Sequence, residues 1–379
     1  MDDRTRDLLR LTLIPRLGPI RIARLLEVFE DPARVLRAAP KALMRVKGVG
    51  EEVAREIALG VGASALALEQ ELELIAEAGL EIVSLGDDRY PPLLAQIPDA
   101  PPILYVKGRI EAVGEAGYPV AIVGSRRCTV YGIEQAERFA GGLARAGLTV
   151  VSGGARGIDT AAHRGALRSG GATVAVLGCG LSHVYPEENA DLFAAATDRG
   201  CVISELPMRT APDSKNFPAR NRIISGLALG TLVIEAGRRS GALITARQAL
   251  DDQNREVMVL PGRVDSAASE GSLEMLKQSS AHLVTAPADV LEVLEGPARH
   301  SFAGTFASRY ATAAAAPPAA TGPEAELLAA LSGPTTIDDL ATRTGRSAAS
   351  LLASITVLEI TGRVRREGAV IHPRAPRGG

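Results

Sequence analysis

The sequence has no tryptophan and only six tyrosines and six phenylalanines among 379 residues. Few aromatic rings are therefore available to stack against nucleic-acid bases, which limits one kind of nucleic-acid site. Cysteine is also scarce: Cys128, Cys179 and Cys201 lie far apart, with no CxxC pair and no histidine cluster beside them. This spacing argues against a disulfide framework and against a zinc site, and it is typical of the reducing cytosol. We expect a cytoplasmic protein without a bound metal.

Long apolar runs and an excess of one charge are missing too. The N-terminal MDDRTRDLLR is charged from its second residue, and no run of about 18 apolar residues could span a bilayer, so we expect no membrane partner. The formal net charge is −2, so any surface for nucleic acid must be local. With 46% hydrophobic and 23% charged residues, the composition is typical of a globular chain of two or three domains.

Helical patterns fill residues 1–80. Within them, VKGVGEEVAREIALG predicts a glycine hairpin followed by a helix, the form of a helix-hairpin-helix element. Such hairpin amides can meet a DNA phosphate. Acids and bases are balanced here, thirteen against twelve, which favours a small helical bundle whose glycines only make a tight turn.

Six short apolar runs alternate with helical stretches between residues 118 and 295. The runs are 120–124, 148–153, 172–178, 201–205, 231–236 and 256–262. Continuous apolar runs predict strands buried on both faces, and the helices between them predict right-handed crossovers. We therefore expect an α/β fold over residues 81–295, with a Rossmann-like, mainly parallel sheet and helices on both faces.

The rest of the chain predicts a linker and a small domain. Residues 296–322 are rich in alanine and proline without apolar periodicity, which is typical of a flexible linker. Residues 323–379 show helix, helix, turn, helix and a short hairpin, the order of a winged-helix domain. Arg346 is the only basic residue between Gly345 and Gly362, the expected recognition helix, so it predicts poor reading of duplex DNA.

The loops after the predicted strands are rich in glycine, serine and arginine. GSRR (124–127), SGGARGID (152–159) and EAGRRSGALITA (235–246) follow three of the strands. Residues 205–247 hold seven basic side chains against three acidic ones. Because ligands bind beyond the carboxyl ends of the strands in open α/β sheets, we expect a phosphate site built from glycine amides, helix N-termini and arginines.

These loops match no common cofactor or catalytic motif. The first loop lacks GxGxxG, and the chain has no GxxxxGK[ST], no GxSxG and no HxH or HExxH. We expect no catalytic residue and no cofactor. We interpret Asp159 as a loop-bracing carboxylate and His163 as a packed residue, and we expect Glu205 and Glu235 to brace basic side chains.

The stretch KNFPARNRIISG (215–226) places cations, an amide and an aromatic ring at a helix start. We expect the cations to contact phosphates, the ring a base face and the amide a base edge. The residues concerned are Lys215, Arg220, Arg222, Phe217 and Asn221. The alternative is a basic helix N-terminus paired with Asp213 and Glu205.

Together these motifs resemble the DNA-processing protein A (DprA/Smf) family. The motifs follow the order in which the family carries them: GSRR, SGGARGIDTAAH, VLGCGL with Tyr185-Pro186, FPARNRIISGL, EAGRRSGALITA and a later PG. The family commonly has an N-terminal helical domain of sterile-alpha-motif type and a C-terminal winged-helix-like domain. One departure is Ser272-Leu273, where the family often shows a GxN-type sequence.

The resemblance implies a DNA-binding protein that is not an enzyme. Such proteins act in natural transformation (competence) and DNA recombination: they bind and protect incoming single-stranded DNA, load the RecA recombinase onto it, and form a homodimer through the Rossmann-like domain. Weak double-stranded DNA binding is also expected. The expected nucleic-acid-binding residues are Ser125, Arg126, Arg127, Ser152, Gly153, Gly154, Arg156, Lys215, Phe217, Arg220, Asn221 and Arg222.

Two other functions stay open at this point. A nucleotide phosphoribohydrolase-like enzyme of the lysine-decarboxylase-like Rossmann family also holds phosphate at glycine loops. It would need a PGGxGTxxE-type segment where this chain has EAGRRSGALITA. A transcription regulator acting through the winged helix is the third interpretation.

Overall fold

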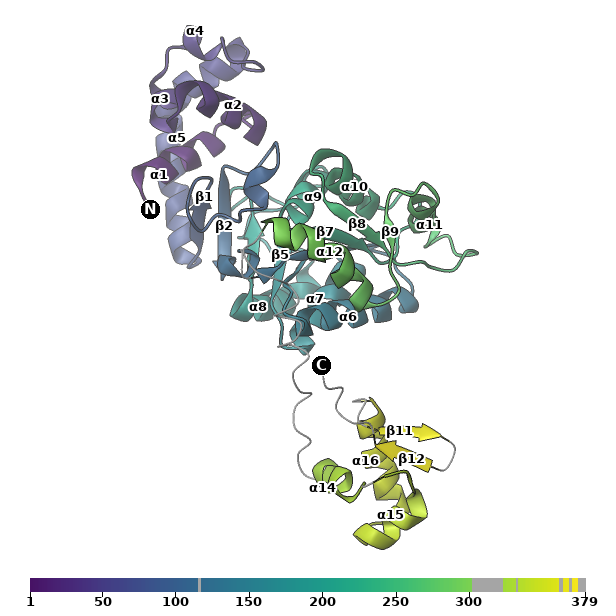
Figure 1. Ribbon diagram of the computed structural model, residues 1–379. Helices are drawn as coiled ribbons and strands as arrows, with labels where there is room; N and C mark the ends of the chain where they lie inside the picture. Colours follow the sequence, from purple (N-terminus) through teal and green to yellow (C-terminus); the bar gives the residue numbers. More distant parts are fainter. Residues whose placement is uncertain (115–116, 302–322, 332, 361–363, 368–369, 374–379) are drawn as a thin grey trace. The chain divides into compact units, whose positions relative to one another are not determined.

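The structure is a computed structural model that describes residues 1–379 except 115–116, 302–322, 332, 361–363, 368–369 and 374–379 (Figure 1). The chain divides into two compact units, Met1–Phe306 and Ala307–Gly379. Among the described residues, no helix combines the length and the hydropathy needed to cross a bilayer.

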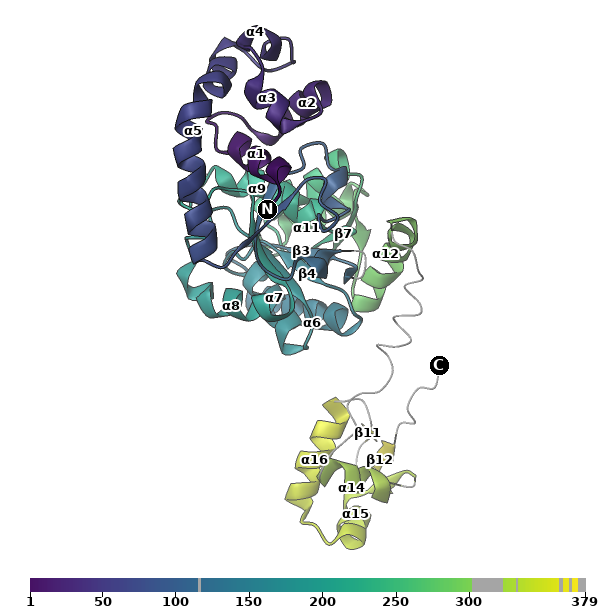
Figure 2. The same ribbon diagram turned by 90° about the vertical axis from the view of Figure 1, so that its left-hand side faces the viewer.

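Five helices open the first unit. They are α1 (Asp3–Thr12), α2 (Pro19–Phe29), α3 (Pro32–Arg37), α4 (Pro40–Leu43) and α5 (Glu51–Glu77). Pro19, Pro32 and Pro40 each stand at the start of a helix, where proline's missing N–H costs no helical hydrogen bond. Figure 2 shows the long α5 running from the outer helices down beside the sheet.

These helices contain two hairpins, of which only the second was predicted. Before α5, Gly48 has a φ of 87°, a left-handed conformation that glycine adopts without steric cost. Before α2, Arg16 stands at the corresponding turn with a φ of 63°. Arg21 joins the two hairpins, because its guanidinium donates to the carbonyl of Gly48 at 2.8 Å and to that of Arg16 at 2.6 Å.

A nine-stranded sheet forms the centre of the first unit. Its strands are β1 (Glu81–Ser84), β2 (Ile103–Gly108), β3 (Val120–Val123), β4 (Val150–Ser152), β5 (Thr173–Val176), β6 (Cys201–Ser204), β7 (Gly230–Val233), β8 (Glu256–Val259) and β9 (His282–Leu283). Their order is β1-β2-β6-β5-β4-β3-β7-β8-β9. Strands β3 to β9 pair in parallel, whereas β2 pairs antiparallel with both β1 and β6. All six predicted strands are confirmed as β3 to β8; β1, β2 and β9 were not predicted.

The strand order creates a switch point between β3 and β7. From β3 the chain builds outward through β4, β5 and β6, and it then returns to place β7 on the other side of β3. At such a point the loops from two neighbouring strands leave toward opposite faces of the sheet and open a crevice. The loops that follow β3 and β7 therefore frame the expected ligand site.

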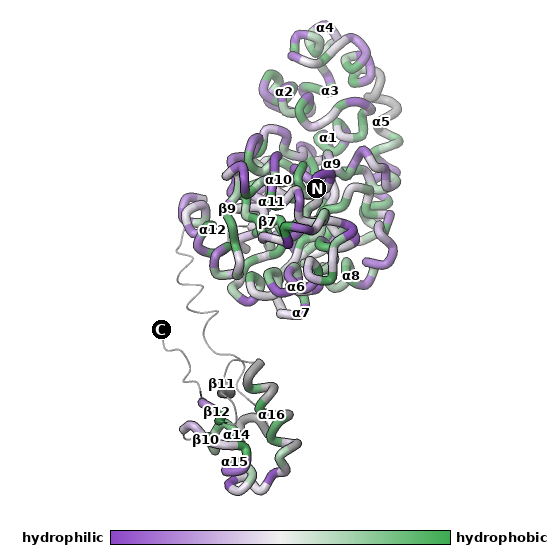
Figure 3. Tube along the Cα trace, turned by 90° about the vertical axis from the view of Figure 1, so that its right-hand side faces the viewer, coloured by the Kyte–Doolittle hydropathy of each residue, from purple (hydrophilic) through white to green (hydrophobic). Residues whose placement is uncertain are grey.

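Helices cover both faces of the sheet, as predicted. One face of the sheet carries α6 (Val130–Arg145), α7 (Ile158–Arg168) and α12 (Pro287–Ser301). Helix α8 (Ala190–Arg199) packs on β5 and β6. The opposite face carries α9 (Asn216–Gly226), α10 (Gly241–Arg247) and α11 (Glu270–Lys277). Strand side chains alternate between the faces: Ile122 of β3 packs with Phe139 of α6, whereas Val123 packs in the cluster that contains Ile224 of α9. In Figure 3 green, hydrophobic trace lies beside the β7 label, and the four residues of that strand are all buried.

The end of the first unit corrects one boundary. Helix α12 continues to Ser301, so residues 296–301 are helical rather than part of the expected linker. Buried Val290, Leu291 and Leu294 hold this helix against the sheet. The remainder of the expected linker, 302–322, lies outside the described residues.

The second unit has its own small core. Its elements are α14 (Pro323–Ala330), β10 (Thr335–Thr336), α15 (Ile337–Thr344), α16 (Ala348–Ile360), β11 (Val364–Glu367) and β12 (Val370–Pro373), with the strands in the order β10-β12-β11. Leu340, Leu351 and Ile371 are fully buried together. The predicted winged-helix order is confirmed. The guanidinium of Arg346 donates to the hydroxyls of Ser350 and Ser354 on α16.

Candidate nucleic-acid interface

A cavity of about 760 Å³ lies at the switch point, beyond the carboxyl ends of β3 and β7. The loops after β3, β4, β5, β6 and β7 and the first residues of α9 and α10 line it. Among the described residues, its ionised lining consists of five arginines and one carboxylate: Arg126, Arg127, Arg220, Arg238, Arg239 and Asp159. The concentration of positive charge that was predicted at this sheet edge is thus gathered in one concave site.

Hydrogen bonds to Glu235 hold the loop after β3, and Arg126 and Arg127 in this loop are exposed. The N–H of Ser125 donates to the carbonyl of Glu235 at 2.7 Å, and the Ser125 hydroxyl accepts from the N–H of Arg127 at 3.1 Å. The Glu235 carboxylate accepts from the N–H and the hydroxyl of Thr129, both at 2.7 Å. Glu235 therefore braces the loop and the start of α6. The prediction that it braces a basic side chain is wrong.

The glycine loop after β4 approaches this first loop closely. Gly157 has a φ of 80°, and a Cβ there would lie 2.4 Å from the carbonyl oxygen of Ser125. The carboxylate of Asp159 accepts from the N–H of Ala155 at 3.3 Å, as expected of a loop-bracing group. Burial raises the pKa of Asp159, and the nearby Arg220 guanidinium opposes that shift.

Arg220 holds the glycine loop from the interior. Its side chain is 3% exposed, and its guanidinium donates to the carbonyl of Gly153 at 2.5 Å and to that of Val176. Burial lowers the pKa of Arg220 to about 10, so it stays protonated at neutral pH. Arg220 thus ties α9 to the loops after β4 and β5 and still lines the floor of the cavity.

His163 is a packed residue, as predicted. Its Nδ1 lies 2.7 Å from the hydroxyl of Thr173, and that hydroxyl donates to the carbonyl of Val150. Because the Thr173 proton is committed to Val150, Nδ1 of His163 must be the donor, which leaves Nε2 as a bare, buried acceptor. Burial lowers the pKa of His163 to about 3.

Arg222 lies in the interior and does not line the cavity. It is 6% exposed and forms a fork with Glu205, at 2.9 and 2.7 Å, and its Nε lies 2.8 Å from Asp99. Glu205 therefore braces a basic side chain, as predicted. Asp99 was missed, because nothing in its sequence context, QIPDAPP, marks it as a partner for a helix 120 residues later.

Three more expected contacts are buried as well. Ser152, whose hydroxyl donates to the carbonyl of Ile122, is in the interior, and so are Gly153 and Gly154. The carbonyl of Gly154 accepts from the Asn189 amide at 2.9 Å. Direct contact with DNA is therefore not proposed for Ser152, Gly153, Gly154 or Arg222: they shape the site from within.

Phe217 lines the cavity but already has a cation on its ring. The guanidinium of Arg126 lies 4.8 Å from the ring centroid, and the ring of Tyr185 is 5.6 Å away. Phe217 thus positions Arg126 as well as offering an aromatic surface. Asn221 also lines the cavity, with its amide 3.4 Å from the carbonyl of Gly241.

Two expected cations have carboxylate partners. Lys215 lies in the chain between the lining residues Ser214 and Phe217, with its amine 3.1 Å from Asp213. Arg156 is exposed and forms a two-point pair with Glu188. Both pairs are open to solvent, and such pairs contribute little energy, so neither cation is held firmly by its carboxylate.

The sequence reasoning missed the arginines that follow β7. Arg238 and Arg239 both line the cavity, and they come from the EAGRRSG segment whose basic character was noted without selecting the two residues. The departure at Ser272 has a structural use here, because its hydroxyl accepts from the N–H of Ala236 at 3.0 Å and braces this loop. In the described ranges, no group of three or more histidine, cysteine, aspartate or glutamate side chains is placed to hold a metal ion.

Comparison with family models agrees with this geometry. Residues 81–295 match the DNA recombination-mediator protein A model, 311–369 match the DprA winged helix domain, and 8–62 match a SAM-like helix-hairpin-helix tandem. The tandem agrees with the two hairpins joined by Arg21.

Curated relatives carry the same family names. The chain is 39% identical over 263 residues to protein Smf of Synechocystis sp., which is 69% of this chain and 65% of the relative. It is 42% identical to protein Smf of Escherichia coli, over 60% of each chain, and 43% identical to DNA processing protein DprA of Streptococcus pneumoniae, over 56% of this chain and 73% of that one. The chain thus spans somewhat less than two thirds of the length of the two Smf proteins.

Two solved structures are similar. The X-ray structure of DNA processing protein A from Streptococcus pneumoniae has a TM-score of 0.68 at 35% identity and covers 77% of this chain and 98% of its own. The DNA processing protein A from Helicobacter pylori, whose structure was described for its single-stranded DNA binding mode, has a TM-score of 0.51 at 28% identity, over 56% of this chain and 95% of its own.

Proposed function

The chain belongs to the DNA recombination-mediator protein A family, and we propose on that basis that it binds single-stranded DNA in the arginine-lined cavity at the sheet switch point. One observation carries the proposal: Arg126, Arg127, Arg238 and Arg239 are exposed around one cavity. Guanidinium groups suit phosphate oxygens because they form paired, charge-assisted hydrogen bonds. Contacts of this kind do not depend on base sequence.

The side chains beneath the cavity support binding without bond cleavage. Asp159 is engaged by Ala155 and lies beside Arg220, and His163 is 1% exposed with its Nδ1 proton committed to Thr173. His163 cannot reach a proton of a ligand, as a general base must, and the Asp159 carboxylate lines the cavity but already accepts from Ala155. We therefore propose a DNA-binding protein that is not an enzyme. Release of adenine from AMP would contradict this.

The wider role follows from the family. We propose that the protein protects incoming single-stranded DNA in natural transformation, loads a RecA recombinase onto it, and acts as a homodimer. Two pockets in a dimer would raise the affinity for one strand through linked binding. Sedimentation tests the dimer, and RecA filament assembly on covered single-stranded DNA tests the loading.

The direct test is a gel-shift comparison of single-stranded and double-stranded oligonucleotides of one sequence. We expect the full-length protein to shift the single strand at lower concentration, because a flexible strand can enter a concave site that a duplex cannot. Equal binding of both forms, or no binding of the single strand, would refute the proposal.

A further inference from the structure

The charge of the cavity exceeds what one phosphodiester neutralises. Its five arginines and one aspartate give a formal charge of 5 − 1 = +4. Within the described part of the chain, no ion pair involves Arg126, Arg127 or Arg239, and Arg238 faces Glu270 at 3.2 Å. Each phosphodiester of a strand brings a single negative charge, so neutralising this site takes several of them or a more highly charged phosphate.

The floor of the cavity holds an unused donor. Arg220 is only 3% exposed, yet its buried Nε has no hydrogen-bond partner among the described residues. A buried donor without an acceptor is costly, so a group that brings an acceptor to this donor gains the energy of satisfying it. Arg220 lines the cavity, but its Nε is closed off from the surface, so a ligand acceptor reaches this donor only with a shift of the Arg220 side chain.

Two helices also begin at this cavity. The lining residue Ala155 precedes α7 and Asp159 lies in its first turn, and Phe217 and Pro218 belong to the first turn of α9; each helix has 11 residues. Helix N-termini carry partial positive charge, which favours an anion. The N–H groups of Ile158, Thr160 and Asn216 already donate to backbone carbonyls, so the contribution here is that of the helix dipoles.

We infer that the cavity selects a phosphomonoester, the phosphate group of a strand end or of a free nucleotide, over the phosphodiester within a strand. A phosphomonoester carries about −1.5 to −2 charges at neutral pH and three terminal oxygens, whereas a diester carries one charge and two such oxygens. The inference rests on the proposed function, since it concerns the same cavity. It adds a ligand class that sequence-independent strand binding does not require.

The test compares labelled 12-nucleotide single strands that differ only at their ends, by fluorescence anisotropy at fixed salt. The strands carry a 5′-phosphate, a 3′-phosphate or hydroxyls at both ends, and a 13-nucleotide hydroxyl strand controls for one added charge. We expect at least one phosphorylated end to raise the affinity about tenfold over both hydroxyl strands, the lower end of the gain from one further charge-assisted hydrogen bond. In a second arm, ADP and adenosine compete for the hydroxyl strand, and displacement by ADP alone identifies a free nucleotide as a ligand.

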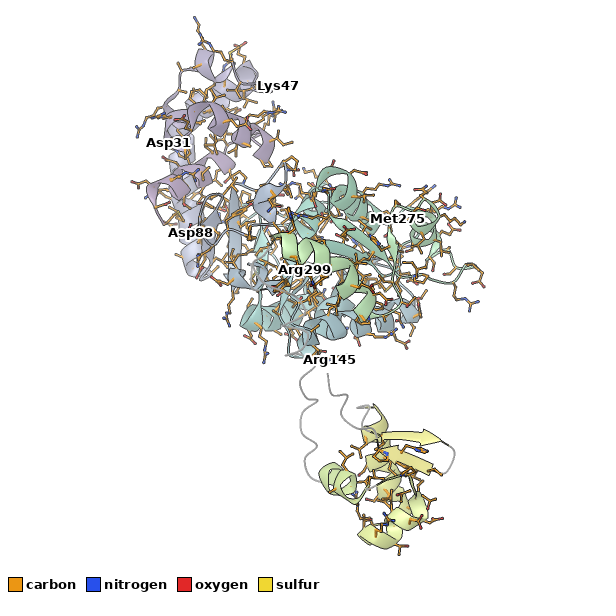
Figure 4. All side chains as sticks on the ribbon, viewed as in Figure 1. Asp31, Lys47, Asp88, Arg145, Met275 and Arg299 are labelled. Carbon is orange, nitrogen blue, oxygen red and sulfur yellow. The ribbon has the colours of Figure 1, made fainter. Side chains whose placement is uncertain are left out.

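Two variants locate the effect. Arg239→Ala should abolish the preference for the phosphorylated ligand, whereas Arg145→Ala removes the same charge elsewhere and should leave the preference intact. Arg145 ends α6 (Figure 4), about 22 Å along that helix from Val130 at the cavity end.

The outcomes separate the two proposals. Equal affinity for all strands together with no displacement by ADP overturns the phosphomonoester inference. If Arg126→Ala still weakens every strand in that case, the proposed function stands. Absence of strand binding by the unmodified protein would instead refute the proposed function.

Discussion

The carboxylate of Glu71 on α5 accepts a hydrogen bond of 2.7 Å from the backbone N–H of Met208, 137 residues later in the chain. Glu71 is 6% exposed, and the Met208 side chain is fully buried in the core of the N-terminal helices. Met208 belongs to the loop after β6, and this loop continues through Ser214 into the Phe217 wall of the cavity. The N-terminal helices therefore hold one wall of the proposed DNA site.

We predict that Glu71→Ala lowers the free energy of unfolding by about 1–3 kcal/mol, because it leaves the Met208 N–H buried without an acceptor. It should also weaken single-stranded DNA binding by loosening the cavity wall. Urea unfolding and anisotropy titration measure the two effects. Glu71→Gln, which keeps an acceptor, should recover most of both, and Glu73→Ala at an exposed neighbour should change neither. An unchanged free energy of unfolding in Glu71→Ala would show that the hydrogen bond between Glu71 and Met208 does not stabilise the fold.

For Arg222→Ala we expect a loss of stability and no change in salt sensitivity. Removing the guanidinium leaves Glu205 and Asp99 without their shared partner, and breaking a buried pair in this way costs about 3–5 kcal/mol. The slope of log affinity against log salt should match the unmodified protein wherever the variant is folded. A variant of unaltered stability with a flatter slope would mean that Arg222 touches phosphate after all.

His163 predicts a specific pH dependence of stability. Its folded pKa of about 3 lies below the unfolded value of about 6.5, so the unfolded chain takes up the proton first as the pH falls. The stability from neutral His163 is complete above pH 6.5 and is lost progressively from pH 6.5 toward 3. Between pH 7.5 and 5.5 the unmodified protein should lose about 1 kcal/mol more than His163→Gln in urea unfolding. Parallel pH profiles would exclude this assignment.

Phe217 and Arg126 should act as a unit. Phe217→Ala removes the ring beneath the guanidinium and should weaken single-stranded DNA binding by about 0.5–2 kcal/mol in the normal protein. In an Arg126→Ala background the same change should have almost no further effect. A double-mutant cycle in binding free energy measures this coupling. Additive losses would indicate that the ring stacks on a base independently of Arg126.

The sequence predicted the buried parallel strands well because burial on both faces leaves an unbroken apolar run. It missed β9, which is two exposed residues long, and β1, whose EIVS pattern is short and half-exposed. It also missed β2, although the first four residues of that strand are apolar and buried. Strands β1 and β9 are edge strands that pair with the neighbouring strand in the sequence, β1 with β2 and β9 with β8, and no local pattern records such pairing.

The site was predicted at the level of loops and not of single cations. Parallel strands bring their carboxyl ends together, so GSRR and EAGRRSG could be placed on one edge from the sequence. Arg220 and Arg222 are two positions apart on a helix, a rotation of about 200° around the helix axis, so their side chains leave nearly opposite sides of α9. One reaches the glycine loop and the other reaches Glu205 and Asp99, while Asn221 between them faces the cavity. Only the packing of α9 decides which side chain is exposed.

The central claim is that exposed arginines at the switch point hold the phosphates of single-stranded DNA. The most direct measurement is the salt dependence of single-stranded DNA affinity for the unmodified protein, Arg126→Ala and Arg145→Ala. The log–log slope should be about −0.7 for each phosphate contacted, and Arg126→Ala should reduce its magnitude by about 0.7 and weaken binding at every salt concentration. Arg145→Ala should leave both unchanged. Identical isotherms and slopes for all three proteins would contradict the account.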